Sequence, residues 1–152
     1  MTLVSGINVP SSLVGSIHVI SILVLEGNEV KLFLDTANIQ DIRDGARMGV
    51  ISGVTTNPSL AASQGISDAE GYKTAVREIS DIVDGPISVE VTSLDAAGMI
   101  AEGRDIASWI PNPWVKIPST VDGFEAISVL SKEGIQINQT LCFSVNQAIL
   151  GA

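Results

Sequence analysis

The chain has 152 residues, is 45% hydrophobic and 16% charged, and carries a formal net charge of −9 at pH 7. This length corresponds to about one domain. The acidic balance argues against nucleic acid or an anionic membrane surface as a partner, because both require basic patches. The single cysteine, Cys142, has no partner for an internal disulfide and fits a cytoplasmic protein. The single histidine, His18, belongs to no cluster with metal-ligand spacing, so we predict no metal site.

The first thirty residues differ in composition from the rest of the chain, because they contain no lysine or arginine. Residues 19–25 are rich in residues that favour strands, residues 26–29 (Glu-Gly-Asn-Glu) are typical of a turn, and a second strand-like run begins at Val30. Two interpretations stay open for this N-terminal extension, residues 1–30: a hairpin or a disordered segment.

From Lys31 onward, strand-like and helix-like segments alternate. We expect strands at 31–35, 53–56, 87–91, 114–117 and 135–140. Asn38 is expected to cap a helix that ends before Gly49, and Asn57-Pro58 to open a turn or helix. Further helices are expected at 67–83, 94–108, 120–132 and 145–150, the first of them from the capping-box spacing of Ser67 and Glu70. Thr120 and Ser144 are expected to cap the last two. This order predicts an α/β fold of parallel strands joined by right-handed helical crossovers.

Two architectures suit this alternation, an open doubly wound sheet and a barrel. No glycine-rich phosphate motif follows the first strand, where Asp35-Thr36-Ala37-Asn38 stands instead. Polar residues do occur near the carboxyl end of every strand, which is typical of the active site of a (β/α)8 (TIM) barrel. Such a barrel takes about 250 residues. We therefore predict a partial TIM barrel of about five parallel strands with intervening helices.

Lys116 lies inside the apolar run Pro113–Pro118 and is the first candidate for chemistry. Burial disfavours the charged form of a lysine, and a neutral amine attacks carbonyl groups to form a Schiff base. The alternative is a lysine at a strand end that extends its amine to water.

The other polar residues near strand ends also have structural alternatives. Asp35 and Asn57 suit helix-entry and turn chemistry as well as a site. Glu90 stands in an apolar strand, where a carboxylate needs a partner. Asn138 and Thr140 alternate with apolar residues, so an ordinary solvated strand face accounts for them too.

Taken together, the runs at the five strands resemble the transaldolase family, and most closely its small single-domain members, which are relatives of fructose-6-phosphate aldolase. The runs, in order, are Leu32–Asn38, Gly53–Leu60, Ser88–Val91, Val115–Pro118 and Ile137–Leu141. The resemblance covers residues 31–152. Glu90 favours a transaldolase, because the aldolases resemble this pattern with a glutamine at that position.

The resemblance implies transfer of a dihydroxyacetone unit between sugar phosphates in the pentose phosphate pathway, through a class I (Schiff-base) mechanism that uses no cofactor. Lys116 is then the Schiff-base lysine, Glu90 the proton relay and Asp35 the base for carbon–carbon cleavage. Thr140 holds the relay water, and Asn57 and Asn138 bind the substrate.

The resemblance also implies that strands six to eight are missing, together with the residues that hold the substrate phosphate and the helices that join subunits. We therefore expect a homo-oligomer or completion by another barrel fragment, because open edges and apolar faces attract partners. The alternative function is a non-catalytic assembly or interaction module. The contacts are expected through apolar strand residues: Leu32, Leu34, Val115, Ile117, Ile135 and Ile137.

Overall fold

The computed structural model describes residues 4–7, 20–24 and 30–152, so His18 and the predicted turn at 26–29 lie outside the described residues. Its strands are β1 (Val4–Ile7), β2 (Ile20–Val24), β3 (Val30–Asp35), β4 (Gly53–Thr55), β5 (Ile87–Glu90), β6 (Pro113–Pro118) and β7 (Ile137–Thr140). The helices are α1 (Ile39–Met48), α2 (Pro58–Ser63), α3 (Ala69–Ile82), α4 (Ala96–Ile106), α5 (Val121–Lys132) and α6 (Val145–Gly151).

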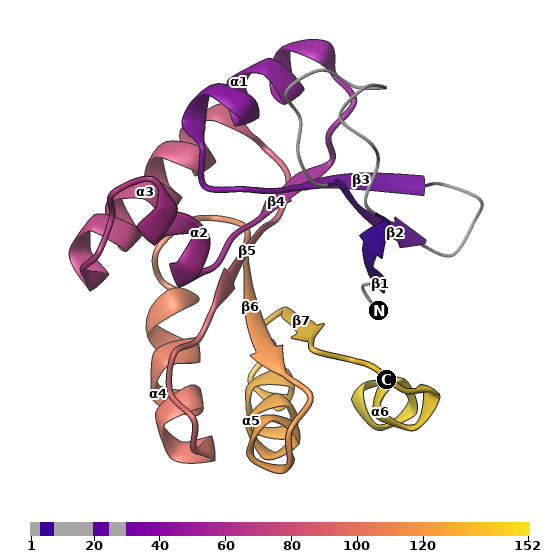
Figure 1. Cartoon of the computed structure of the whole chain (residues 1–152). Helices are drawn as coiled ribbons and strands as arrows, with labels where there is room; N and C mark the ends of the chain where they lie inside the picture. Colours follow the sequence, from indigo (N-terminus) through magenta and orange to yellow (C-terminus); the bar gives the residue numbers. More distant parts are fainter. Residues whose placement is uncertain (1–3, 8–19, 25–29) are drawn as a thin grey trace.

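All seven strands form one sheet, whose spatial order is the order of the sequence. Strands β3 to β7 pair in parallel with one another, whereas β2 pairs antiparallel with both β1 and β3. Figure 1 shows the parallel strands curling together, with α1, α3, α4 and α5 along the outside. The five parallel strands and their helices form a partial α/β barrel, which confirms the predicted fold class.

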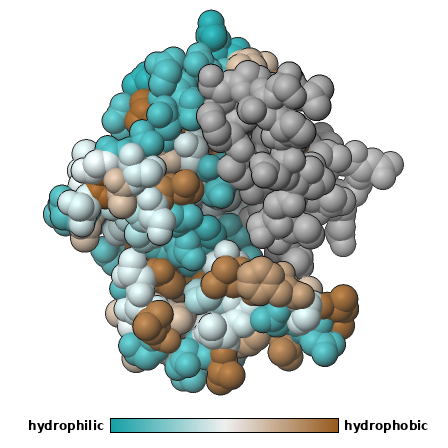
Figure 2. Space-filling view, in the orientation of Figure 1, coloured by the Kyte–Doolittle hydropathy of each residue, from teal (hydrophilic) through white to brown (hydrophobic). Residues whose placement is uncertain are grey.

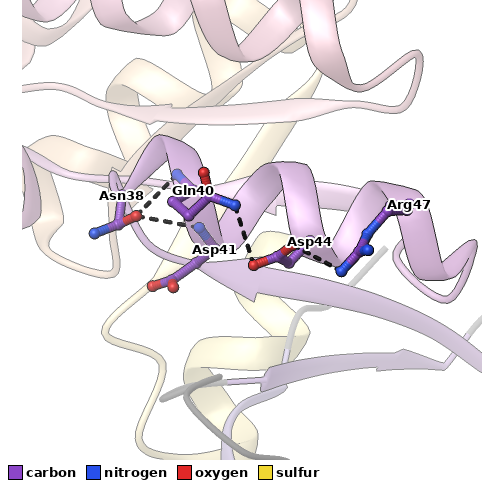
Figure 3. A network of polar contacts seen from close by, with 5 residues as sticks. All are labelled: Asn38, Gln40, Asp41, Asp44 and Arg47. Carbon is purple, nitrogen blue, oxygen red and sulfur yellow. Dashed lines mark hydrogen bonds and ion pairs between the residues drawn. The ribbon is translucent and has the colours of Figure 1, made fainter.

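The helices begin where a side chain satisfies their first backbone N–H groups. The Asn38 side chain accepts hydrogen bonds from the backbone N–H groups of Gln40 and Asp41 and so caps α1 (Figure 3). The same helix ends at Gly49, which takes the left-handed conformation (φ 69°) that favours glycine. Thr120 caps α5 and Ser144 caps α6, as the sequence predicted.

Two predicted helix starts are wrong by one or two residues. The cap of α3 is Asp68, whose side chain accepts from the Gly71 N–H, and not Ser67. The cap of α4 is Asp95, so the helix begins after Leu94, which is exposed. In both places an aspartate, one of the strongest capping residues, lies beside the residue that was predicted.

Along each parallel strand, successive side chains alternate between the face covered by the helices and the concave face of the sheet. On β6, Val115 and Ile117 are fully buried, and Val115 lies against Gly103 of α4. Leu34 of β3 is buried in the same core. The expectation that these three side chains form an exposed contact surface is therefore wrong, because they pack under the helices. The concave side carries the residues between them, among them Lys116.

Gly123, in the first turn of α5, packs directly against the strand that carries Lys116. A Cβ atom at this position would lie 1.9 Å from the Pro118 carbonyl oxygen. Gly123→Ala gains about 1 kcal/mol in helix propensity, but the clash of two backbone segments should remove about 3 kcal/mol. We expect a net loss of about 2 kcal/mol in the free energy of unfolding, measured by urea denaturation.

Ser128→Ala, on the exposed face of the same helix, is the matched control and should change that free energy by less than about 0.5 kcal/mol. A Gly123→Ala protein as stable as the parent would show that α5 shifts away from β6 without loss.

The C-terminal end of the described chain carries much of its exposed apolar surface. Helix α6 contains no buried residue. The exposed large side chains on and before it are Leu141, Phe143, Val145, Ile149 and Leu150. Figure 2 shows brown side chains gathered over this end of the molecule. Among the described residues, no helix has the length and apolar character needed to cross a membrane.

Candidate active site

Strand register brings three of the predicted site residues into one row. Lys116 on β6 is the direct neighbour of Glu90 on β5 and of Asn138 on β7. The residues two positions earlier on β5 and β6 are Ser88 and Trp114, which pair with each other in the next row down. Phe33 of β3 lies beside Trp114, with ring centroids 6.1 Å apart. These two rings form an aromatic floor beneath the row that holds Lys116.

Lys116 and Glu90 form an ion pair, with 3.2 Å between Nζ and Oε2. The Lys116 side chain is 12% exposed and that of Glu90 is 22% exposed, so the pair is shielded from solvent but not sealed from it. The alternative reading of Lys116, an amine extended to bulk water, is thus not what the structure shows. Shielding of this degree makes the interaction stronger than an ordinary surface ion pair.

Asn138 is buried beside this pair and has one free hydrogen-bonding atom. Its Nδ2 donates to Ser88 Oγ at 2.5 Å. Its Oδ1 is buried and has no partner within the described part of the chain. A buried acceptor without a partner is destabilising by about 1–3 kcal/mol. Such an atom is common where a ligand or an ordered water completes a site.

Asp35 is held by Thr55, whereas Glu90 pairs with Lys116. The carboxylate, at the end of β3, accepts a hydrogen bond of 2.8 Å from Thr55 Oγ1 on β4. Thr55 pairs in register with Ser88 of β5, which in turn binds Asn138. Asp35 therefore belongs to the same concave side, one row below the Lys116–Glu90 pair.

The two remaining predicted residues have backbone roles. Asn57 follows β4 and caps α2, with its Oδ1 accepting from the Leu60 N–H at 2.8 Å. The Thr140 carbonyl, at the end of β7, accepts from the N–H and the hydroxyl of Ser119. Asn57 thus opens a helix, one of the two alternatives expected at Asn57-Pro58, and this role leaves the Nδ2 group of its side chain available.

Sequence reasoning missed Ser88 and Thr55, the two hydroxyl residues that connect the predicted site residues. The available signal was spacing, because Ser88 lies two residues before Glu90 and Thr55 lies two residues before Asn57. Side chains two apart on a strand share a face. Gln139 points the other way, where its Nε2 binds Ser119 Oγ and the Gln147 carbonyl and so attaches α6 to the barrel.

A cavity of about 540 Å³ lies between α2, α3 and α4, and Lys116 is not among its lining residues. Of the predicted site residues it is lined by Glu90 alone. Tyr72 lies in its wall, and the Tyr72 hydroxyl sits near Thr56 and the backbone of Glu90 without completing a hydrogen bond. Burial raises the pKa of Tyr72, so this phenol stays protonated.

Glu102 of α4 also lines this cavity and holds the loop that follows Glu90. Its carboxylate accepts hydrogen bonds from the backbone and the hydroxyl groups of both Thr92 and Ser93. Partial burial opposes ionisation, but these four hydrogen bonds outweigh it and lower the pKa of Glu102. The carboxylate therefore stabilises the fold above its unfolded pKa of about 4.3, and that contribution is lost as the pH falls through the lower folded value.

We expect Glu102→Gln to lower the free energy of unfolding at neutral pH by about 1–2 kcal/mol, because an amide cannot accept all four bonds. The variant should also lose less stability than the parent as the pH falls below about 4.3. Urea denaturation from about pH 3 to about pH 7 measures both effects, with the exposed Glu125→Gln as control. An unchanged pH dependence in Glu102→Gln would contradict the assigned role.

Residues 32–152 match the family described as Transaldolase/Fructose-6-phosphate aldolase. The chain belongs to this family. It is 55% identical over 124 residues to a probable transaldolase of Dehalococcoides mccartyi, and 57% identical over 125 residues to one of Agathobacter rectalis. Each comparison covers 81% of this chain and 56% of the relative. The chain thus spans about half the length of the curated transaldolase relatives that it matches, and the family resemblance seen in the five strand runs is confirmed.

Proposed function

We propose that this chain carries the Schiff-base centre of a transaldolase, which transfers a dihydroxyacetone unit between sugar phosphates of the pentose phosphate pathway. The observation that carries this proposal is the shielded Lys116–Glu90 pair on the concave side of the partial barrel. Buried lysines are rare unless they are paired or have a chemical task. Family membership, which covers both carboxylates and the lysine, supports the same conclusion.

The first step is proton removal from Lys116, because an ammonium group has no lone pair for attack. Glu90 Oε2, 3.2 Å from Nζ, is placed to accept that proton directly or through a water. The neutral amine then attacks the C2 carbonyl of a ketose phosphate and forms a carbinolamine. Glu90 returns the proton to the departing hydroxyl, water leaves, and an iminium ion joins Lys116 to the sugar.

Cleavage follows when Asp35 accepts the proton of the C4 hydroxyl. The C3–C4 bond breaks, its electrons move into the iminium, and a dihydroxyacetone enamine remains on Lys116. An acceptor aldehyde then takes the three-carbon unit, and hydrolysis frees the lysine. Asn138 Oδ1 and Asn57 Nδ2 are assigned to substrate hydroxyls, and Thr140 to the relay water. The iminium is the electron sink, so these steps require no metal or organic cofactor.

The described arginines do not supply a convincing site for the substrate phosphate. Arg43, Arg47 and Arg104 lie on outer helices, in ion pairs with Glu78, Asp44 and Glu133. Arg77 is exposed on α3, another outer helix. Binding energy from a remote phosphate normally helps to orient the reacting carbon atoms. We therefore propose that this chain forms the imine with low substrate affinity, and that efficient transfer requires a phosphate site that these arginines do not provide.

Borohydride reduction tests the proposal, because it converts a transient imine into a stable amine. The protein is incubated with a high concentration of fructose 6-phosphate, or of dihydroxyacetone, which needs no phosphate site. Reduction is followed by peptide mapping of the four lysines: Lys31, Lys73, Lys116 and Lys132. We expect the adduct on Lys116 alone. An adduct spread over the other lysines, or none with either ketone, would overturn the proposal.

The alternative function is a non-catalytic assembly or interaction module. The exposed apolar side chains on and before α6 favour it, because contiguous surface of this kind usually has a partner. The trapping experiment separates the two functions, since a module without chemistry shows no preference for Lys116 over the lysines on helices.

A further inference from the structure

The layer of helices outside the sheet has a gap between α3 and α4. Helix α4 packs along α5, and α1 packs along α3, whereas α3 and α4 make little contact with each other. Helices α2, α3 and α4 lie on the same flank of the sheet (Figure 1), and the cavity of about 540 Å³ lies between them. This volume falls within the range of sites that bind small molecules, about 300–1,000 Å³.

The wall of this cavity is largely apolar and contains a pair of aromatic rings. Tyr72 of α3 and Trp109, which follows α4, stand nearly perpendicular, with an interplanar angle of 88° and ring centroids 6.2 Å apart. Aromatic side chains offer a large apolar area and a defined geometry to a ligand. Aliphatic side chains complete this part of the wall: Ala61, Ala62, Ile66 and Ile106. The cavity is therefore suited to the apolar body of a small molecule.

The hydroxyl of Tyr72 is a polar group without a partner at this wall. Tyr72 is only 8% exposed, and its Oη has no hydrogen-bond partner among the described residues. A buried polar atom of this kind is destabilising, and it is common where a ligand or an ordered water completes a site. Because the phenol stays protonated, it can both donate and accept a hydrogen bond.

The described charged residues that line the cavity are all acidic. Two of them, Glu90 and Asp105, are each paired with a lysine. The other two, Asp68 and Glu102, have no ion-pair partner within the described part of the chain. Two negative charges at the cavity are therefore not compensated by a cation of the protein, and they repel an anionic ligand.

Asp68 and Glu102 differ in how they can act on a ligand. The oxygens of Glu102 already accept four hydrogen bonds from the loop after β5, so this carboxylate acts through its charge. Asp68 uses only Oδ1, which accepts from the Gly71 N–H at the start of α3. The helix N-terminus, which would otherwise attract an anion, is thus already occupied by a carboxylate. Asp68 Oδ2 is left for a donor, and an ammonium group is the strongest donor for a carboxylate.

We propose that the cavity between α2, α3 and α4 binds a small amphipathic amine. Its apolar body lies against Tyr72 and Trp109, and its ammonium group donates to Asp68 Oδ2 within the field of Glu102. The Tyr72 hydroxyl bonds a polar atom of the same ligand. Binding is non-covalent and separate from the chemistry of Lys116, which attacks carbonyl groups and not amines.

NMR spectroscopy of the isotope-labelled full chain tests the site with phenethylamine, which joins one ring to one ammonium group. The chain has two tryptophans and so gives two indole N–H signals, which the Trp109→Phe variant assigns. The Trp109 indole donates to Asp105 at the cavity. We expect its signal to shift with a Kd of about 1–10 mM, the range for a ligand of this size. The signal of Trp114, in the aromatic floor beneath Lys116, should not shift.

Two further probes of similar shape separate charge from apolar contact. Phenethyl alcohol has no charge and should bind at least about fivefold more weakly, because the charge-assisted hydrogen bond is lost. Phenylpropionate carries the opposite charge and should shift neither indole signal. An alcohol that binds as tightly as the amine would overturn the proposal, because the carboxylates would then not select the ligand.

Asp68→Asn tests the assigned carboxylate without removing the helix cap, because asparagine caps helices as well as aspartate does. It should weaken phenethylamine binding at least about fivefold. Asp81→Asn, at an exposed position near the other end of α3, makes the same change in net charge and should leave the Kd unchanged. Ala62→Phe places a ring in the cavity and should abolish the shift of the Trp109 signal in a protein that urea denaturation shows to be folded.

Three results would contradict the proposal. Absence of a Trp109 shift at phenethylamine concentrations up to about 30 mM would show that the cavity takes no amine of this kind. A shift of the Trp114 signal alone would place the amine on the concave side of the sheet. Equal weakening in Asp68→Asn and Asp81→Asn would reduce the effect to net charge. None of these measurements involves imine trapping, so a failure of the Schiff-base function would not be confused with a failure of this site.

Discussion

Replacing Lys116 with methionine should abolish the borohydride-trapped adduct, which is the largest effect expected of any single substitution in this chain. Methionine is similar to lysine in length but has no amine, so no imine forms. The other lysines cannot substitute, because Lys73 lies on α3, near Asp105 and over the Trp109 ring, and the rest lie at a strand start and in the last turn of α5. Peptide mapping after reduction with dihydroxyacetone measures the loss.

Lys73→Met is the matched control and should leave the Lys116 adduct unchanged. The fold of Lys116→Met is checked by urea denaturation. Its Glu90 loses a partner but keeps contact with solvent, so we expect a loss of about 1–2 kcal/mol, which is less than for a fully buried ion pair. Persistent trapping in a folded Lys116→Met protein would exclude this lysine as the nucleophile.

Glu90→Gln should slow adduct formation about a hundredfold or more, within the range for loss of a general acid–base group. Whether Glu90→Gln slows or speeds adduct formation distinguishes two roles for this carboxylate. If Glu90 only held Lys116 in its charged form, its removal would free the amine and speed the reaction. If it carries protons to and from the carbinolamine, its removal slows the reaction, because the first transfer loses its acceptor and the second its donor. The rate of borohydride-trapped product over time, at fixed ketone concentration, separates the two roles.

Asp35→Asn provides the contrast for this experiment. Its carboxylate is assigned to the later cleavage of the C3–C4 bond, so the variant should form the adduct at nearly the parental rate. With fructose 6-phosphate it should retain the six-carbon sugar on Lys116, which the mass of the adduct reveals. Adduct formation slowed equally in Glu90→Gln and Asp35→Asn would contradict the separate roles of Glu90 in imine formation and Asp35 in C3–C4 cleavage.

Local sequence predicted those parts of the fold that depend on neighbouring residues. Asn38, Thr120 and Ser144 cap helices as expected, because a capping side chain acts on N–H groups two or three residues away. The prediction failed by one residue at Ser67, because Asp68 competes for the same role. It also failed for Leu34 and Val115, since the two faces of a parallel strand are both largely covered and apolar character does not distinguish them.

The site was predictable as a set of residue types and not as a set of contacts. Glu90 and Lys116 stand out because each is a charged residue in an apolar strand. Their pairing depends on the register between β5 and β6, which is a property of the crossover through α4 and of the packing beneath it. The link from Asn138 to Ser88 spans fifty residues of sequence, and no local pattern specifies it.

The sequential order of the strands has a consequence for synthesis. Because each strand pairs with the one made just before it, the sheet can grow at one edge as the chain leaves the ribosome. Glu90 and Lys116 meet when β6 pairs with β5, which requires no contact from β7 or α6. No closure has to span an earlier strand, because each strand pairs with its neighbour in sequence, and this limits the loss of chain entropy at each step. The ion pair that we propose as the reactive centre thus depends on β5 and β6 alone, and the strand and helix that follow are added beside it.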